Sequence, residues 1–448
     1  MLLVGPASAE PQNPGAAPAR RVEVVDSLGL TITLPQGLTG IAPLDPREKN
    51  EQIRVGWRGM LGKSRLSILL YALPVAKFSF AEPEDVNDLI LRNQLERDPS
   101  FAFEHTDLVS GAFGYAALGA IGWGALHSKD GAKVESSYFV LGGLLEKDGY
   151  SLEVVATPPI DAAGERAVLD FLHTGVVYAG KQLDPKWTDD EHRERWLRDV
   201  PEDLQKKLEK PVRTEHYIFL SNTASAKDMA KSMEANYAVI QKTYPFEERP
   251  SRRLMPVFLF RTAAEYHSFY AKVLQSTVET AARSKGVAYQ DFYATYFEAK
   301  GDPVHIHEGT HQVFRNRLRL GGGGSWFQEG VAEYICTRAT ERVEATNAVK
   351  KERHTKLAEF IAVKSLLRDA KTDKKSGDTA MSQYLQAALL IEFVHESKWS
   401  KDKFQDWVHA IGLCPDNNVV AIERATQATL GVDLAELEKR WVEYCKKR

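Results

Sequence analysis

Apolar residues between positions 21 and 180 recur in short runs and alternations that predict a sheet with few helices. Short strands are expected at residues 22–25, 30–34, 66–71, 138–145 and 150–156. Apolar residues at helical spacing predict helices over residues 82–94 and 162–177, and the second should bury Val168, Phe171 and Leu172. This order of elements predicts an α+β module over residues 21–180.

The apolar pattern is interrupted over residues 181–211. Charged residues dominate this segment, and prolines stand at positions 185, 201 and 211. Such a composition is typical of a solvated connection between domains. We therefore interpret residues 181–211 as a charged linker with some helix.

The pattern resumes near residue 212 and continues to the end of the chain. Strands are expected at residues 216–220, 255–260 and 289–297. The first two are separated by a helix with an apolar stripe, formed by Met229, Met233, Tyr237, Ile240 and Tyr244. Beyond Glu329 the pattern is helical, and the last helix has Leu434, Leu437, Trp441 and Tyr444 on one face. Residues 212–448 thus predict a second α+β domain, a small sheet followed by a helical lobe.

The composition of the 448-residue chain is that of an ordinary globular protein with two or three domains. Hydrophobic residues make up 43% of the chain and charged residues 27%, with a net charge of −3. This balance gives no reason to expect nucleic acid or an anionic membrane as a partner. Because no run of 18 apolar residues occurs, no membrane span is predicted.

The N-terminus and the cysteines bear on localisation. Residues 1–20 contain the small-x-small sequence Ala7-Ser8-Ala9 and then a segment rich in proline and alanine. We interpret residues 1–20 as a leader or signal remnant, which predicts a secreted or periplasmic protein. If the segment is instead a plain tail, a cytoplasmic protein is expected. The three cysteines are expected to be free thiols, with one disulfide between Cys414 and Cys445 as the alternative in an exported protein.

The most informative motif is H-E-x-x-H, formed by His307, Glu308 and His311. On a helix the two histidines lie one turn apart on the same face, so both imidazoles can bind one Zn²⁺ ion. The carboxylate of Glu308 then lies beside the metal, where it can accept a proton from a bound water. The motif predicts a zinc hydrolase site.

The third zinc ligand must come from elsewhere in the chain. The metzincin extension of the motif is absent, because Phe314 and Arg317 occupy its glycine and histidine positions. A glutamate on a second helix is the other common solution, and Glu329 in Trp326-x-x-Glu329-Gly330-x-Ala332 supplies it. Glu333, one turn later, is an alternative ligand.

These motifs resemble those of the gluzincin zinc metallopeptidases, particularly the aminopeptidase-N type, and of bacterial peptidase MA-like domains. The resemblance covers residues 212–448, and its motifs are specific over residues 307–334. It implies a thermolysin-like domain with Glu329 as the third ligand. It also places Tyr384 where gluzincins carry a tyrosine that stabilises the transition state, although Tyr384 fits a core position equally well.

Two further comparisons qualify this resemblance. The Gly-x-Met-Glu-Asn segment by which aminopeptidase-N-type enzymes hold the substrate amine is absent upstream of His307, so aminopeptidase activity is not expected. The large N-terminal sheet domain of that group is also absent. Residues 21–180 instead loosely resemble the small α/β/α sandwich of the photosystem II oxygen-evolving-protein-like group.

Three further features lie near the motif, and two of them have two interpretations each. Glu333 either accepts the N–H of a histidine ligand or is a solvated surface residue. His305 either supports the site or has only a structural role. The glycine run from Gly321 to Gly324 must form a loop, and its mobility could gate a substrate cleft.

The leading functional hypothesis is a zinc-dependent peptidase acting on peptides or proteins, with Glu308 as general base. The alternative is a catalytically inactive binding protein on the same scaffold. The sequence identifies no partner for the N-terminal module.

Overall fold

The computed structural model describes residues 21–45, 52–74, 80, 82–98, 101, 105–109, 119–128, 133–145, 148–178, 186–198, 200–208, 211–246, 248, 251, 253–289, 291–296, 302–366 and 377–448. The expected leader, residues 1–20, lies outside this part of the chain. The chain divides into two compact units. The first comprises residues 1–87, 103–128 and 132–183, and the second comprises residues 88–102, 129–131 and 184–448. Both units mix helices and strands, so the α+β class is confirmed.

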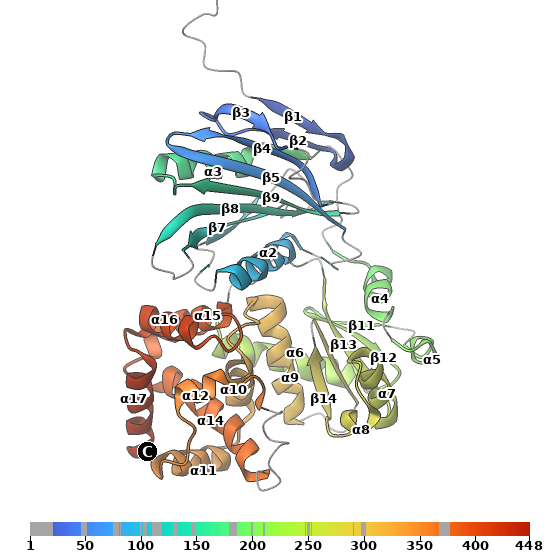
Figure 1. The fold of residues 1–448 in the computed structure, drawn as a ribbon. Helices are drawn as coiled ribbons and strands as arrows, with labels where there is room; N and C mark the ends of the chain where they lie inside the picture. The colour runs from blue at the N-terminus through green and yellow to red at the C-terminus, as the bar shows by residue number, and fades with distance from the viewer. Residues whose placement is uncertain are drawn as a thin grey trace, which may run out of the picture. The chain divides into compact units, whose positions relative to one another are not determined.

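The first unit is built on a seven-stranded antiparallel sheet (Figure 1). Its strand order is β3 (Thr39–Pro43), β4 (Ile53–Leu61), β5 (Ser64–Pro74), β9 (Asp148–Thr157), β8 (Val134–Leu144), β7 (Gly119–His127) and β6 (His105–Val109). Buried and less buried residues alternate along β5, as a sheet with one face on a core requires. Helix α2 (Pro83–Arg97) contacts this sheet near its start, where Asn87 Nδ2 donates to the carbonyl of Ala120 (2.7 Å).

A second sheet in this unit joins β1 (Val22–Val25), β2 (Leu30–Thr33) and β10 (Val176–Tyr178). The strands expected at residues 22–25 and 30–34 are confirmed, and they pair as a hairpin in which Gly29 has a φ of 63°. Helix α3 (Ala162–Thr174) buries Val168, Phe171 and Leu172 as predicted. The predicted helix end at residue 177 is wrong, because Gly175 ends the helix and the β-branched residues after it pair with β2.

The second unit has a five-stranded mixed sheet. Its strand order is β11 (Val212–Arg213), β12 (Tyr217–Ser221), β13 (Met255–Phe260), β15 (Phe292–Tyr296) and β14 (Gly286–Tyr289). Strands β12, β13 and β15 are parallel, while β11 and β14 are antiparallel edge strands. The strand expected at residues 289–297 is present as β15, but it begins at Phe292, and Tyr289 belongs to β14, which pairs with β15 in a hairpin.

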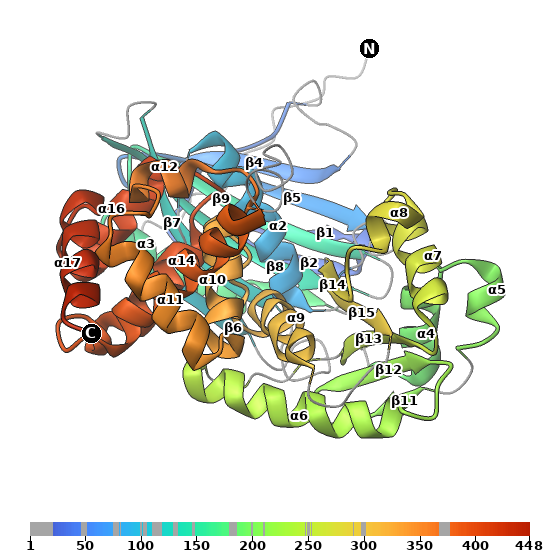
Figure 2. The ribbon, with the colours of Figure 1, turned by 90° about the horizontal axis from the view of Figure 1, so that it is seen from below.

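Helices make up the rest of the second unit. Those before the metal-site motif are α4 (Asp189–Leu197), α5 (Glu202–Gln205), α6 (Ala226–Thr243), α7 (Ala263–Val273) and α8 (Val278–Ala281). The motif helix α9 (Pro303–Val313) continues into a π-helical turn, η3 (Phe314–Leu318), and Figure 2 shows α6 running beside α9. The helical lobe follows with α10 (Ser325–Cys336), α11 (Ala339–Lys350), α12 (Leu357–Ala362), α14 (Gly377–Glu396), α15 (Phe404–Leu413), α16 (Val419–Leu430) and α17 (Leu434–Lys446). None of the described helices is long and apolar enough to cross a membrane.

The described part of the expected linker, residues 181–211, contains the helix that the sequence predicts. Helices α4 and α5 form, and Trp196, Leu197 and Leu204 pack into a core with β12, β13 and α7. Charged residues surround these apolar residues in the sequence, so the apolar pattern did not predict that they are buried. Residues 189–208 therefore belong to the second unit, because burying these large side chains against its sheet is favourable.

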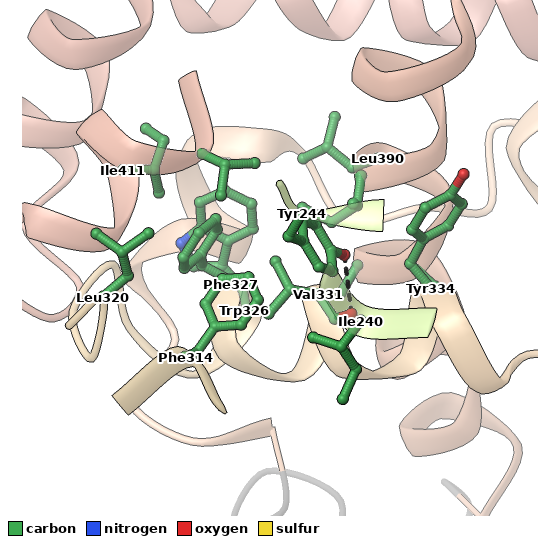
Figure 3. Packing of buried hydrophobic residues seen from close by; sticks show 14 of the residues in the cluster. Ile240, Tyr244, Phe314, Leu320, Trp326, Phe327, Val331, Tyr334, Leu390 and Ile411 are labelled. Carbon is green, nitrogen blue, oxygen red and sulfur yellow. Dashed lines mark hydrogen bonds between the residues drawn. The ribbon is translucent and has the colours of Figure 1, made fainter. Parts of the chain in front are cut away.

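The main core of the second unit lies between α6, α10, α14 and α15 (Figure 3). Trp326 and Phe327 at the start of α10 are buried among aromatic and aliphatic side chains. Tyr244 is also buried, and its hydroxyl donates to the carbonyl of Val331 on α10 (2.9 Å; Figure 3). A buried tyrosine hydroxyl needs such a partner, so this bond fixes where α10 lies against the end of α6.

Candidate metal centre

Helix α9 carries the two histidines of the motif on one face. Asp302 caps the helix by accepting the N–H of Val304 (3.1 Å), and Pro303 occupies the first helical position, where it needs no N–H. The rings of His307 and His311 consequently lie one turn apart, with centroids separated by 4.9 Å. The helix that the motif requires is therefore present.

The glycine run before α10 positions that helix. Gly323 and Gly324 have φ values of +84° and +87°, a region that side chains disfavour. The N–H of Gly322 donates to the carbonyl of Gly412, and that of Gly323 to the carbonyl of Cys414. These bonds fasten the run to the end of α15, and the predicted loop is confirmed.

Close packing holds α10 against α14. A Cβ atom on Gly330 would lie 3.1–3.2 Å from atoms of Ala387 and Ile391, closer than ordinary packing allows. The absence of a side chain at position 330 thus lets the two helices approach. This approach, together with the bond from Tyr244, sets the distance between α10 and α9.

Glu329 on α10 faces both histidines on α9. His307 Nε2 lies 3.2 Å from Glu329 Oε2 and 3.3 Å from His311 Nε2. His311 Nε2 lies 3.5 Å from the same Glu329 oxygen. The three side chains expose only 12–19% of their surface, so the group is shielded but reachable. The structure brings together all three predicted zinc ligands.

The spacing of these three atoms fits a tetrahedral zinc ion. Zinc binds imidazole nitrogen and carboxylate oxygen at about 2.0–2.2 Å, so two ligand atoms of a tetrahedral site lie roughly 3.3–3.5 Å apart. The observed separations are 3.2, 3.3 and 3.5 Å. Three protein ligands leave one coordination position for water or substrate, as in catalytic zinc sites.

Glu333 lies on the other side of His307. Its Oε2 atom is 3.2 Å from His307 Nδ1, while Thr337 Oγ1 donates to Oε1 (3.1 Å). An N–H at Nδ1 directed at Glu333 leaves the lone pair of Nε2 facing Glu329 and His311. The structure thus places Glu333 as a hydrogen-bond acceptor that orients His307, outside the three-ligand group.

The charges of the group favour a cation between α9 and α10. Burial lowers the pKa of His307, but its contacts with Cys336, Glu329 and Glu333 outweigh this effect and raise that pKa well above the usual value. Burial raises the pKa of Glu329, but the nearby His311 and His307 lower it well below the usual value. Glu329 is therefore ionised, and its negative charge stabilises either a proton on the histidines or a metal ion bound to them.

Glu308 is turned toward the sheet edge. Its Oε2 atom accepts the N–H of Ala288 in the edge strand β14 (2.7 Å). This bond fixes one oxygen of the carboxylate, whose charge also helps to raise the pKa of His307. The link between Glu308 and β14 could not be seen in the sequence, because residues 288 and 308 are brought together only by the fold.

Tyr384 and His305 complete the predicted residues. Tyr384 on α14 is partly buried against the main core, and its pKa is raised by burial and by the charges of Glu329, Glu308 and Glu333. The ring therefore lies within electrostatic reach of the three carboxylates. His305 is buried and its Nδ1 is 2.8 Å from the hydroxyl of Tyr293, which favours the structural role.

Sequence reasoning missed the part played by Cys336. Its Sγ atom lies 3.7 Å from His307 Nδ1 and 3.5 Å from Glu333 Oε2. The signal was present, because Glu329, Glu333 and Cys336 follow one another at helical spacing on one face of α10. All three cysteines are free, so the alternative disulfide between Cys414 and Cys445 is absent from the structure.

No family model matches the chain, and no curated protein matches it either. An M1 zinc metallopeptidase from Deinococcus radiodurans is 9% identical over 86% of this chain and 90% of that chain, with a TM-score of 0.28. A cyanobacterial PsbP from Synechocystis sp. PCC 6803 is 11% identical over 39% of this chain and 99% of that chain, also with a TM-score of 0.28. Likenesses this distant carry no argument about function, which must come from the site itself.

Proposed function

We propose that the protein is a zinc-dependent peptidase that hydrolyses peptide bonds in peptides or proteins. The observation that carries the proposal is the mutual separation of 3.2–3.5 Å among His307 Nε2, His311 Nε2 and Glu329 Oε2. Two neutral donors and one carboxylate at this spacing match the ligand set of a catalytic zinc ion. When bound there, zinc would polarise the scissile carbonyl and lower the pKa of a water molecule towards ~7.

Glu308 is the general base in this proposal. Its Oε2 atom is engaged by the N–H of Ala288, so we assign the proton transfer to Oε1. That oxygen receives a proton from the attacking water and returns it to the leaving amine. The bond to β14 limits the rotation of the carboxylate and so holds it in place for both transfers.

Tyr384 is assigned a second role in the reaction. Burial and the charges of Glu329, Glu308 and Glu333 raise the pKa of its phenol, so these carboxylates lie within electrostatic reach of a hydroxyl that is protonated at neutral pH. A protonated phenol can donate a hydrogen bond to the oxyanion that forms during hydrolysis. Glu333 contributes indirectly, since it orients the His307 ring.

The alternative is a binding protein that holds zinc without catalysis. Retention of Glu308 weighs against it, because a metal site without hydrolysis needs no base beside its ligands. The bond from Ala288 that orients this carboxylate also fits the peptidase better.

Three variants of the zinc-loaded protein test the proposal. Glu308→Gln should keep the metal and lower kcat by ~10²–10⁴-fold, because only the base is lost. Tyr384→Phe should also keep the metal and lower kcat by ~10²–10³-fold, because one oxyanion donor is lost. Glu329→Ala should lose the ion held by His307 Nε2, His311 and Glu329, and the activity with it. Metal content by mass spectrometry and cleavage of a peptide library provide the two measurements.

Glu344→Gln is the matched control, since Glu344 is exposed on α11 and far along the chain from the motif. Its metal content and activity should equal those of the unmodified protein. Hydrolysis that persists in Glu308→Gln would show the base assignment to be wrong. A zinc-loaded protein that cleaves no peptide would favour the binding protein.

A further inference from the structure

His307 faces a second set of metal-ligand atoms with its other ring nitrogen. Around Nδ1 lie Glu333 Oε2 at 3.2 Å and Cys336 Sγ at 3.7 Å, and these two atoms are 3.5 Å from each other. Nitrogen, oxygen and sulfur ligands of this kind are the usual partners of zinc and related ions. The set shares only the His307 ring with the group formed by Nε2.

The separations fit a tetrahedral ion with one sulfur ligand. Bonds of about 2.0–2.2 Å to nitrogen and oxygen and about 2.3 Å to sulfur place the nitrogen and oxygen ~3.4 Å apart, and the sulfur ~3.6 Å from each of them. The structure has 3.2 Å for the first distance and 3.7 and 3.5 Å for the other two. No side chain needs to move far to complete such a site.

The surroundings hold the two ligands from α10 in position. Thr337 Oγ1 donates both to Glu333 Oε1 and to the Glu333 carbonyl, which leaves Oε2 directed at His307. Cys336 is only partly buried, whereas Cys414 and Cys445 are buried. An ion from solvent can therefore reach the Cys336 thiol, and a thiolate selects zinc, cobalt or cadmium over magnesium or calcium.

We propose that His307 Nδ1, Glu333 and Cys336 form a second binding site, for a thiophilic divalent metal ion. Filling the site releases the thiol proton of Cys336 and the Nδ1 proton of His307 to solvent. With ions at both sites, His307 is an imidazolate that bridges them. The site depends on the fold alone and holds whether or not the chain hydrolyses peptides.

Cobalt titration of the metal-free full-length protein tests this site. A cobalt–thiolate bond gives a charge-transfer absorption band in the near ultraviolet, which nitrogen and oxygen ligands do not give. We expect two Co²⁺ ions per chain at saturation, with this band present. Cys336→Ser should bind one ion and lose the band, whereas the matched variant Cys414→Ser should keep two ions and the band.

Glu329→Ala separates this site from the proposed catalytic one. It should lose one ion and keep the thiolate band, because its ligand belongs only to the Nε2 group. A failure of the peptidase proposal would appear as a lack of hydrolysis with the band unchanged. Absence of a thiolate band in the unmodified protein, or its survival in Cys336→Ser, would overturn the second site.

A measurement on the unmodified protein guards against misfolding of the cysteine variants. Alkylation of each thiol can be followed by mass spectrometry with and without Co²⁺. Cobalt should slow the alkylation of Cys336 at least tenfold and leave the rates of Cys414 and Cys445 unchanged. Equal rates for Cys336 in both conditions would contradict the proposal.

Discussion

At the residue scale, both ring nitrogens of His307 contact possible metal-site residues. Nε2 faces Glu329 and His311, while Nδ1 faces Glu333. A carboxylate that accepts the N–H of a metal-bound imidazole fixes its tautomer and makes the other nitrogen a better ligand. The quality of the zinc site therefore depends on a residue that does not itself touch the Nε2 group.

Replacement of Glu333 should weaken zinc binding by the group at His307 Nε2 without removing it. Glu333→Ala leaves Nδ1 of His307 without its carboxylate acceptor, and we expect ~10–100-fold weaker affinity. Glu333→Gln keeps an oxygen that can accept the same hydrogen bond, so its loss should be smaller. Competition with a chelator measures both affinities, and Glu344→Ala is the exposed control. An unchanged affinity in Glu333→Ala would show that this contact does not tune the site.

At the scale of elements, α10 is placed by contacts outside the site. The glycine run is bonded to the end of α15, and Gln328 Nε2 donates to the carbonyls of Leu320 and Gly322. Gly324 begins the helix with φ +87° and ψ 176°, a conformation open essentially to glycine alone. The position of Glu329 relative to α9 thus depends on backbone geometry five residues earlier.

Substitution within the glycine run should show that the backbone at Gly324 positions α10. Gly324→Ala forces a side chain into a region that costs about 1–3 kcal/mol, and its Cβ would meet Asn417 at 2.4 Å. We expect a lower free energy of unfolding and weaker zinc binding. Gly321→Ala is the matched control, because its nearest neighbour is 3.8 Å away. It should change the free energy of unfolding by less than about 0.5 kcal/mol.

Urea unfolding and chelator competition measure the two effects. Equal behaviour of the two alanine variants would show that the left-handed backbone at Gly324 does not set the position of α10.

At the scale of the whole molecule, one continuous core supports the metal centre. Residues of α6, α9, α10, α14 and α15 belong to the same buried cluster in the second unit. The two ligand helices cannot separate without exposing part of this core. Metal binding and the stability of the second unit are therefore linked, because an ion that binds only the folded form stabilises it.

Chelation should loosen the second unit measurably. At a zinc concentration 100 times the Kd, the ion contributes about 2.7 kcal/mol, so amides that exchange through opening of this core should exchange ~100-fold faster after removal of zinc. Hydrogen–deuterium exchange of peptides from α9 and α10 gives the measurement. The double variant Glu329→Ala/Cys336→Ser is the control, since it lacks a ligand of each group and its exchange should not respond to zinc. Equal exchange of the unmodified protein with and without zinc would contradict this linkage.

The sequence by itself determined the local arrangements. Helical spacing put His307 and His311 on one face, and the same spacing put Glu329 and Glu333 on another helix. Apolar periodicity likewise predicted α3, α6 and α17, because it reflects neighbours along one helix. Such features depend on the chemistry of adjacent residues and can be recognised without the fold.

Only the tertiary structure decided how these pieces meet. It paired the expected strand β15 with β14, packed helices of the expected linker into a core, and bonded the glycine run to the end of α15. It also brought Ala288 to Glu308 and Cys336 to His307. These pairings depend on how close two elements lie that are far apart in the sequence. That distance is set by the packing of buried side chains across the whole unit, so no single segment of the sequence encodes it.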